Sequence, residues 1–430
     1  MNEPKNYLIK AAHILSPGSL NHNQVMDVLI RDAKIQKIDN SITANLRDTR
    51  QIDAKGQYLV PGFFDLNANY GEPGYETKED LHTGAASALA GGFTGVAVQP
   101  NTNPPLHRKS EVAMIRNRAK DIPVEIYPVG TISKYREGKE LAELYDMKSA
   151  GAIAFGDGDQ NVSDAGLMGR ALLYAKGINT LVISYPEDEK ISAGAVMNEG
   201  KTSTYLGMKG NPNLAEALMV ARDLYLAEYH GAKIHFTTIS TAESVDLIRK
   251  AKAKGVAVTC DVAAHHLLLT DESLTGFDSH FKVQPPLRIK SDVKAILKGL
   301  KDGTIDAIVS QHTPHEIEYK RVELQLAKFG IISQQTVLPT VLKAGIDISL
   351  LVEKLAIGPR NIVGLPVPTI EVGETPNFVL IDPRQEWDFD EKTNRSKSAN
   401  SPFMGTKQKG MVTHVFLKHL IHTNYGSKDQ

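Results

Sequence analysis

Short apolar runs alternate with helical patterns through the middle of the chain. The strand-like runs are Phe93–Val98, Ile126–Val129, Ala152–Phe155, Leu181–Ser184, Lys233–Thr237, Ala257–Val262 and Ile305–Ser310. Stretches with helical spacing lie between them, including Ser110–Lys120, Leu214–Tyr229, Thr241–Lys254 and Ser291–Leu300. Such alternation predicts parallel strands joined by right-handed crossovers. With one further strand near residue 63, the pattern predicts an α/β fold with a (β/α)8 TIM-type barrel over residues 61–365.

Both ends of the chain read as strands without intervening helices. The N-terminal candidates are Tyr7–Ile9, Val25–Ile30, Ile35–Ile38 and Tyr58–Val60, and the C-terminal ones are Phe378–Ile381, Met411–Leu417 and Leu420–His422. Because a one-sided β layer needs a covering layer, we expect residues 1–60 and 366–430 to form one composite β-sandwich domain. The polar span Arg384–Gly410 is predicted to be a long surface loop.

The barrel is expected to begin with the stretch Pro61–Asp80. Phe63, Phe64 and Leu66 predict a buried strand, and glycines and prolines close the loop that follows. Residues two apart on a strand point the same way, so Asn67 and Asn69 project together from the carboxyl end of this strand. In a β/α barrel that end carries the chemistry.

Composition narrows the class of protein without naming an activity. A formal net charge of −1 gives no global field for nucleic acid or an anionic membrane. No apolar run reaches the roughly 18 residues of a membrane span, and Met1–Leu8 is too polar for a secretory signal. The single cysteine, Cys260, excludes an intramolecular disulfide. We therefore expect a cytoplasmic protein with no nucleic-acid or membrane partner.

A series of motifs in a fixed order gives a family resemblance. They are P-G-F-F-D-L-N-A-N at 61–69, G-G-F-T-G-V at 91–96, P-N-T-N-P at 100–104, M-N-E-G at 197–200, S-T-A-E-S-V at 240–245, H-H-L-L-L-T-D-E at 265–272, K-V-Q-P-P-L-R at 282–288 and D-G-T-I-D-A-I-V-S-Q-H-T-P-H at 302–315. Together they resemble dihydroorotase of the bacterial class I type, in the amidohydrolase superfamily. The resemblance implies that superfamily's barrel and its small composite β domain.

The family's metal-ligand positions carry other residues in this chain. The resemblance implies two zinc ions at the strand ends, and the six matching positions here are Asn67, Asn69, Gly158, Tyr185, Thr238 and Gln311. Neutral amides and hydroxyls are poor ligands for zinc, and an amide at 311 is no general base. Asp157 and Asp159 flank Gly158, and a shift of register would let one of them take the ligand role. Without such a shift we expect no zinc and no other cofactor.

The family's substrate contacts survive only in part. The resemblance assigns substrate binding to Asn101, to position 284, which carries Gln284, and to His265, while the family arginine is replaced by Gly71. We expect His265, His266, His312 and His315 to hold loops at the barrel mouth. A new zinc site from His265, His312 and His315 is the less favoured reading, because these residues come from different strands.

The sequence therefore predicts a catalytically inactive dihydroorotase homologue with a structural or regulatory role in pyrimidine biosynthesis. The resemblance implies aspartate carbamoyltransferase as a partner, and a homodimer is the other expected assembly. The alternative is an active dihydroorotase or another cyclic-amide hydrolase, since fold does not fix function. A third reading is a small-molecule sensor, whose emptied pocket would have a polar, uncharged lining.

Overall fold

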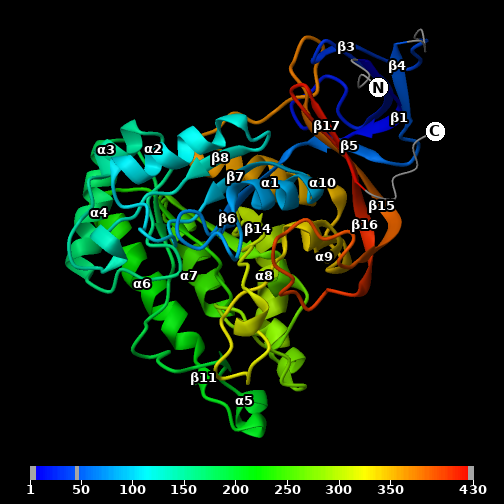
Figure 1. The fold of residues 1–430 in the computed structure, drawn as a ribbon. Coiled ribbons are helices and arrows are strands. Elements are labelled where there is room, and N and C mark those ends of the chain that lie inside the picture. The colour runs from blue at the N-terminus through cyan, green and yellow to red at the C-terminus, as the bar shows by residue number, and fades with distance from the viewer. Residues whose placement is uncertain (1–5, 44–47, 425–430) are drawn as a thin grey trace.

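A computed structural model describes residues 6–43 and 48–424, so the predicted lack of a signal in Met1–Leu8 lies largely outside it. Parallel strands form two arcs of a barrel (Figure 1). The first arc is β6 (Phe63–Ala68), β7 (Phe93–Val98) and β8 (Glu125–Pro128); the second is β9 (Val182–Ser184), β12 (Ile234–Phe236), β13 (Val258–Ala263) and β14 (Ala307–Val309). Single bridges from Phe155 to Gly130 and Val182, and from Ala68 to His312, close the arcs. The eighth strand position is thus one bridging residue, where the sequence predicted the strand Ala152–Phe155.

The barrel strands are buried on both faces, which explains their apolar character. Every residue of β6 is buried. Phe64 and Leu66 point into the barrel interior with Ala97 and Val309. Phe63, on the other face, packs with the residues that lie beneath the surrounding helices.

Helices cover the outside of the barrel. They are α1 (Leu81–Ala90), α2 (Lys109–Arg118), α3 (Leu144–Ser149), α4 (Ala165–Gly177), α6 (Asn213–His230), α7 (Ala242–Ala253), α8 (Lys290–Lys301), α9 (Val337–Lys343), α10 (Ile348–Val352) and α11 (Gly358–Val363). Several begin at capping side chains: Asp80 accepts from His82 N and Thr83 N at 3.0 and 2.9 Å. After β9, the short pair β10 (Met197–Asn198) and β11 (Gly210–Asn211) carries α5 (Lys201–Leu206) away from the barrel (Figure 1).

The two chain ends share one sheet. Its strands are β1 (Asn6–Ile14), β2 (Gln24–Arg31), β3 (Lys34–Asp39), β4 (Thr49–Asp53), β5 (Tyr58–Pro61), β15 (Asn377–Phe389), β16 (Thr406–Leu417) and β17 (Leu420–Thr423). β5 joins the halves, because it pairs with β1 on one side and with β15 on the other. The expected sandwich of two sheets is instead, among the described residues, one hydrogen-bonded sheet around a core that includes Ile9, Leu59 and Phe378.

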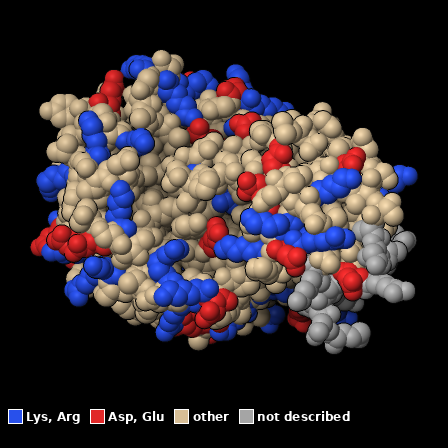
Figure 2. Space-filling model, turned by 90° about the horizontal axis from the view of Figure 1, so that it is seen from above, with Lys and Arg blue, Asp and Glu red and all other residues tan. Residues whose placement is uncertain are grey.

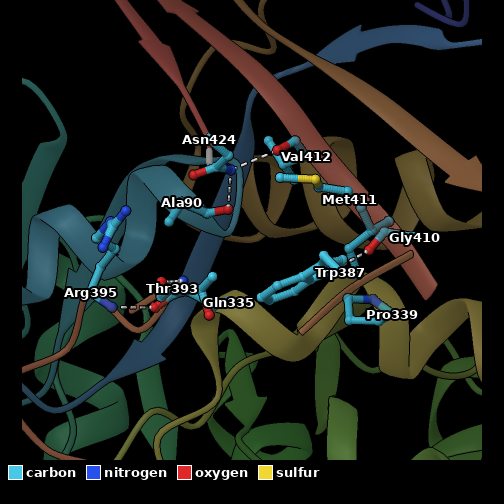
Figure 3. A pocket seen from close by; sticks show the side chains of 11 residues that line it. Ala90, Gln335, Pro339, Trp387, Thr393, Arg395, Gly410, Met411, Val412 and Asn424 are labelled. Atoms are coloured by element: carbon cyan, nitrogen blue, oxygen red, sulfur yellow. Dashed lines mark hydrogen bonds between the residues drawn. The ribbon is translucent and has the colours of Figure 1, made fainter. Parts of the chain in front are cut away.

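The predicted surface loop Arg384–Gly410 is shorter in the structure, because strands occupy both of its ends. β15 continues to Phe389 and β16 begins at Thr406, so the two strands form a long hairpin. Phe389 is buried, and the Trp387 indole N–H donates to Gly410 O at 2.9 Å. Figure 3 shows Trp387 in the crevice where this hairpin meets the end of α1 and α9.

The remaining loop, residues 390–405, is tied to the barrel mouth. Lys397 N donates to Glu79 Oε1 at 3.0 Å, and Asn400 Nδ2 donates to Thr313 O at 2.9 Å. The face in Figure 2 shows cations and anions interspersed rather than a field of one sign. Among the described residues, no helix has the length and apolar character to cross a membrane.

Candidate functional site at the barrel mouth

Asn67 and Asn69 leave the end of β6 side by side and tie that strand to its neighbours. Asn67 Nδ2 donates to Thr237 Oγ1 at 3.0 Å. Asn69 Nδ2 donates to Thr313 Oγ1 at 3.0 Å, and its Oδ1 accepts from Asn101 Nδ2 at 2.9 Å. Both amides therefore serve as cross-links between strand ends.

A cleft of about 660 Å³ opens above these amides. Seven of the candidate residues line it: Asn67, Asn69, Asn101, Gly158, Tyr185, Gln284 and Gln311. Thr238 and His265 do not line it and are buried beside it. Asp159 also lines the cleft, so its lining is not uncharged as the sensor reading expected.

Gly158, which the sequence analysis matched to a metal-ligand position, has a left-handed φ of 68°. A Cβ built there would lie 1.6 Å from Asn101 Oδ1, so Asn101 fills the space a side chain would need. The neighbouring carboxylates do not replace it. Asp157 turns away and accepts from Ile132 N and Ser133 N at 2.8 and 3.0 Å, and its burial raises its pKa. Asp159 forms an ion pair with Arg136 at the rim.

A buried carboxylate, Glu187, lies beneath Tyr185. The Tyr185 hydroxyl donates to Glu187 Oε2 at 2.9 Å, Asn211 Nδ2 donates to Oε1 at 2.7 Å, and Gln284 Nε2 also donates to Oε2. Burial, then the charge of Glu187, raises the pKa of Tyr185 well above its usual value. The phenol is therefore a hydrogen-bond donor and not an anionic ligand. Sequence reasoning missed Glu187, although its position two residues after Tyr185 was a usable signal.

Thr238 and Gln311 share an uncommon backbone conformation, with φ of 52° at each. Thr238 N donates to Asp261 Oδ1 at 2.5 Å, and Gln311 Nε2 donates to Gln284 O at 2.8 Å. A non-glycine residue in this region costs on the order of 1–3 kcal/mol and persists only where its surroundings hold it. The backbone is therefore strained at Thr238 and Gln311, and both of these residues have uncharged side chains.

Asp261, on β13, is a second buried carboxylate that the sequence reasoning missed. It accepts from Thr237 Oγ1 at 3.1 Å and contacts His235 Nε2 at 3.0 Å, while His235 Nδ1 contacts Thr259 Oγ1 at 2.9 Å. Together these contacts form a chain that links Asn67 to Thr237, Thr237 to Asp261 and Asp261 to His235. Nothing in the spacing of the sequence shows that these strand ends face one another.

The other mouth histidines contact protein groups. His312 Nδ1 accepts from Ser333 N at 3.2 Å, and its Nε2 faces Glu79 Oε2 at 3.3 Å. His266 contacts Pro285 O at 3.1 Å and His315 contacts Phe329 O at 2.8 Å; burial lowers the pKa of each to about 4. His265 is buried beside Gln311, and burial, together with the neighbouring His266, holds its pKa well below the usual value.

The donor set at the mouth does not fit a zinc pair. Zinc selects imidazole, thiolate or carboxylate, whereas the cleft offers engaged amide groups, a phenol that stays protonated and one carboxylate, Asp159, which is paired with Arg136. Within residues 6–43 and 48–424, no group of three His, Cys, Asp or Glu side chains is arranged to hold a metal ion.

The barrel, its mouth and the sheet built from both ends define an amidohydrolase-type TIM-barrel fold. L-hydantoinase (dihydropyrimidinase) from Arthrobacter aurescens has the same fold, with a TM-score of 0.85 at 22% identity over 98% of this chain and 96% of that one. A D-hydantoinase gives a TM-score of 0.81 at 22% identity over 97% of this chain and 95% of that one.

Sequence similarity narrows the class. The family model described as dihydro-orotase-like matches residues 56–244. A protein named dihydroorotase from Acetivibrio thermocellus is 42% identical over 95% of this chain and 97% of its own length. One from Citrifermentans bemidjiense is 43% identical over 96% and 98%. The chain belongs to the dihydroorotase family.

Proposed function

We propose that this chain is a non-catalytic member of the dihydroorotase family that acts through protein contacts in pyrimidine biosynthesis. The observation that carries the proposal is the set of neutral residues matched to the family's ligand positions, whose amide side chains are engaged by neighbouring groups of the protein. Asn67 binds Thr237, Asn69 binds Asn101, and Gln311 binds the backbone of Gln284. In the family a metal supplies the nucleophile by acidifying a bound water. Gln311, which the resemblance matches to the family's proton shuttle, carries a neutral amide that cannot take up a proton near neutral pH.

The second candidate is an active dihydroorotase, and the similarity to relatives of that name favours it. Identity of 42–43% over nearly the whole chain extends well beyond the barrel core. Such an enzyme would interconvert carbamoyl aspartate and dihydroorotate. Asn101 and Gln284, which line the cleft at positions matched to substrate contacts of the family, would then hold the substrate, whereas His265 is buried beside the cleft.

Metal content and turnover of the purified chain separate the two candidates. We expect less than stoichiometric zinc after dialysis against a mild chelator, and turnover at least about 10³-fold below the Acetivibrio thermocellus relative assayed in parallel. The double variant Asn67→His/Asn69→His is expected to remain inactive, because positions 158, 185, 238 and 311 still lack ligands. Stoichiometric zinc together with turnover within about tenfold of the relative would establish the second candidate.

The proposed partners are a second copy of the chain or aspartate carbamoyltransferase. The support for a protein partner is that the chain has the family's fold, although the residues matched to the metal-ligand positions differ from the family's. Co-expression with the transferase, followed by size-exclusion chromatography with light scattering, tests the assignment. A chain that stays monomeric, while the transferase assembles and works unchanged without it, would contradict both partners.

A further inference from the structure

A second pocket, at the rim of the barrel mouth, faces three cations. It has a volume of about 940 Å³. Among the residues that the structure describes, Lys78, Arg136 and Lys328 line it together with one carboxylate, Asp159. His315 also lines it and is neutral at pH 7, because burial, and then the charge of Lys78, lower its pKa to about 4. The lining therefore has an excess of two positive charges. We call this space the rim pocket.

The rim pocket differs from the cleft that the family's ligand positions define. Asn69 and Asn101 line both spaces, whereas Gln284 lines only the cleft. Gly71, which the resemblance matched to the family's arginine, lines the rim pocket, and a Cβ built there would lie 2.2 Å from Tyr75 O. No side chain fits at position 71 in this loop, so the cations of the rim pocket come from other segments.

Arg136 reaches the rim pocket from a strained turn. Tyr135 and Arg136 both have left-handed backbone conformations, with φ of 55° and 61°. Side chains on either side hold the turn: the Tyr135 hydroxyl accepts from the Arg108 guanidinium at 2.6 Å, and Arg136 Nε donates to Asp157 O at 2.9 Å. Non-glycine residues in this region are unfavourable, and such strain clusters at ligand sites.

The two lysines of the rim pocket have no carboxylate within ion-pairing distance in the described part of the chain. Lys78 is half-buried, and its Nζ lies 4.8 Å from the centroid of the Tyr75 ring. Burial lowers the pKa of Lys78, and the charge of Lys328 lowers it further, although Glu316 and Asp159 act in the opposite direction. The pocket wall thus presents cations that no neighbouring anion neutralises.

Two more cations lie behind Lys328. Lys282 and Lys320 are buried, and their ammonium groups donate to backbone oxygens, to Leu324 O at 2.7 Å and to Lys328 O at 2.8 Å respectively. Burial, then the charge of Lys328, lowers the pKa of Lys282 to about 8. Burial, then the charge of Lys282, lowers the pKa of Lys320 to about 7, and Asp278 opposes this shift. Cations that repel one another in this way favour an anion beside them.

We propose that the rim pocket binds a small phosphate monoester, with its phosphoryl group among Lys78, Arg136 and Lys328. A phosphate monoester carries about −1.5 to −2 charges at pH 7, which matches the excess positive charge of the lining. Lysine and arginine donate charge-assisted hydrogen bonds to phosphate oxygens. The pocket is larger than a bare phosphate needs, and the rings of Tyr75 and Phe329 line it, so they contact the organic part of the ligand. This inference goes beyond the proposed function and does not depend on it.

Calorimetric titration of the full chain tests the class of ligand. We expect inorganic phosphate to bind at low ionic strength with a Kd of about 1 mM or tighter. Phenyl phosphate should bind at least about fivefold tighter, because its ring contacts Tyr75 and Phe329. Succinate, a dianion whose charges lie on separate groups, should bind at least about tenfold more weakly than phosphate. No phosphate binding, no gain from the phenyl group, or equal binding of succinate would overturn the inference.

Charge-neutralising variants test the position of the phosphoryl group. Lys78→Gln and Lys328→Gln should each weaken phenyl phosphate binding at least about tenfold. Lys298→Gln removes an exposed lysine of α8 that does not line the rim pocket, so this matched control should change binding by less than about twofold. Thermal unfolding checks that all three variants fold. Unchanged binding in both pocket variants, or equal weakening in Lys298→Gln, would place the anion elsewhere and overturn the inference.

The pH dependence of sulfate binding is a further readout. Sulfate stays doubly charged between about pH 6.5 and about pH 9, so a change in its affinity reports on the protein. Because Lys320 and Lys282 lose their protons near pH 7 and pH 8, sulfate should bind at least about fivefold tighter at the lower end of this range. A flat profile would contradict an anion beside these lysines. Zinc content and turnover decide the proposed function separately, so either result can fail without the other.

Discussion

At the scale of single residues, the mouth of the barrel is a network of neutral groups fixed by buried carboxylates. Asp261 orients Thr238, Thr237 and His235, and Glu187 collects hydrogen bonds from Tyr185, Asn211 and Gln284. The contacts of Asp261 come from β12 and the residues directly after it, whereas the donors to Glu187 come from three separate segments. Removing one donor is costly, because a buried acceptor loses a charge-assisted bond worth about 1.5–3 kcal/mol.

Tyr185→Phe tests that cost at Glu187. The variant keeps the ring and deletes the hydroxyl that donates at 2.9 Å. We expect the free energy of unfolding to fall by about 1.5–3 kcal/mol in urea titrations. Tyr205→Phe, at a site 83% exposed, is the matched control and should change it by less than about 0.5 kcal/mol. Equal effects of the two variants would show that the hydroxyl contact contributes little.

The buried histidines predict a dependence of stability on pH. His266 and His315 have pKa values lowered to about 4, whereas an unfolded histidine titrates near 6.5. The unfolded state takes up protons first as the pH falls, so stability is full above pH 6.5 and declines towards pH 4, by up to about 3 kcal/mol per histidine.

Urea midpoints measured from pH 7 to pH 4.5 check this slope. His315→Gln keeps an amide that can donate to Phe329 O but cannot titrate, so its decline should be shallower. His22→Gln, at an exposed position, is the control and should leave the slope unchanged. An unchanged slope in His315→Gln would contradict the assignment.

At the scale of elements, hydrophobic periodicity predicted the long helices and most strands. The predicted helix Leu214–Tyr229 is α6, Asn213–His230, because its buried positions recur at helical spacing. The periodicity predicted short elements less well. It did not predict β4, and the predicted strand Ala152–Phe155 is a single bridging residue. The candidate site, too, could be predicted only in part. Seven candidate residues line one cleft because strand ends converge, whereas Glu187 and Asp261 depend on contacts across strands that spacing does not reveal.

The extended hairpin of β15 and β16 makes an element-scale prediction. Phe389 sits at the end of β15 and is 1% exposed, so Phe389→Ala leaves a cavity. We expect a loss of about 3–5 kcal/mol in the free energy of unfolding. Phe277→Ala, at a site 49% exposed, should cost under about 1 kcal/mol and serves as the control. A small effect at Phe389 would mean that the hairpin tip contributes little to the fold.

At the scale of the whole molecule, the composite sheet makes the two chain ends interdependent. β5 pairs in parallel with β1 and antiparallel with β15, so it holds strands that lie more than three hundred residues apart in the sequence. Loop-closure entropy rises slowly with loop length, so inserting a whole barrel between paired strands is tolerated. The predicted boundaries at residues 60 and 366 therefore mark where the chain enters and leaves the barrel. The sheet needs strands from both ends of the chain.

Splitting the chain tests this interdependence. Residues 1–365 expressed alone lose β15, whose Phe378, Val379 and Leu380 are fully buried, and expose β5 as an unpaired edge. We expect that fragment to aggregate, and to become soluble when residues 366–430 are co-expressed, with both fragments purifying together through a tag on the first. The matched control replaces Leu380 in the second fragment with aspartate, which should abolish rescue because a buried unpaired charge is costly. If fragment 1–365 alone were soluble and unfolded cooperatively, the barrel would be an independent unit and the shared sheet an accessory to it.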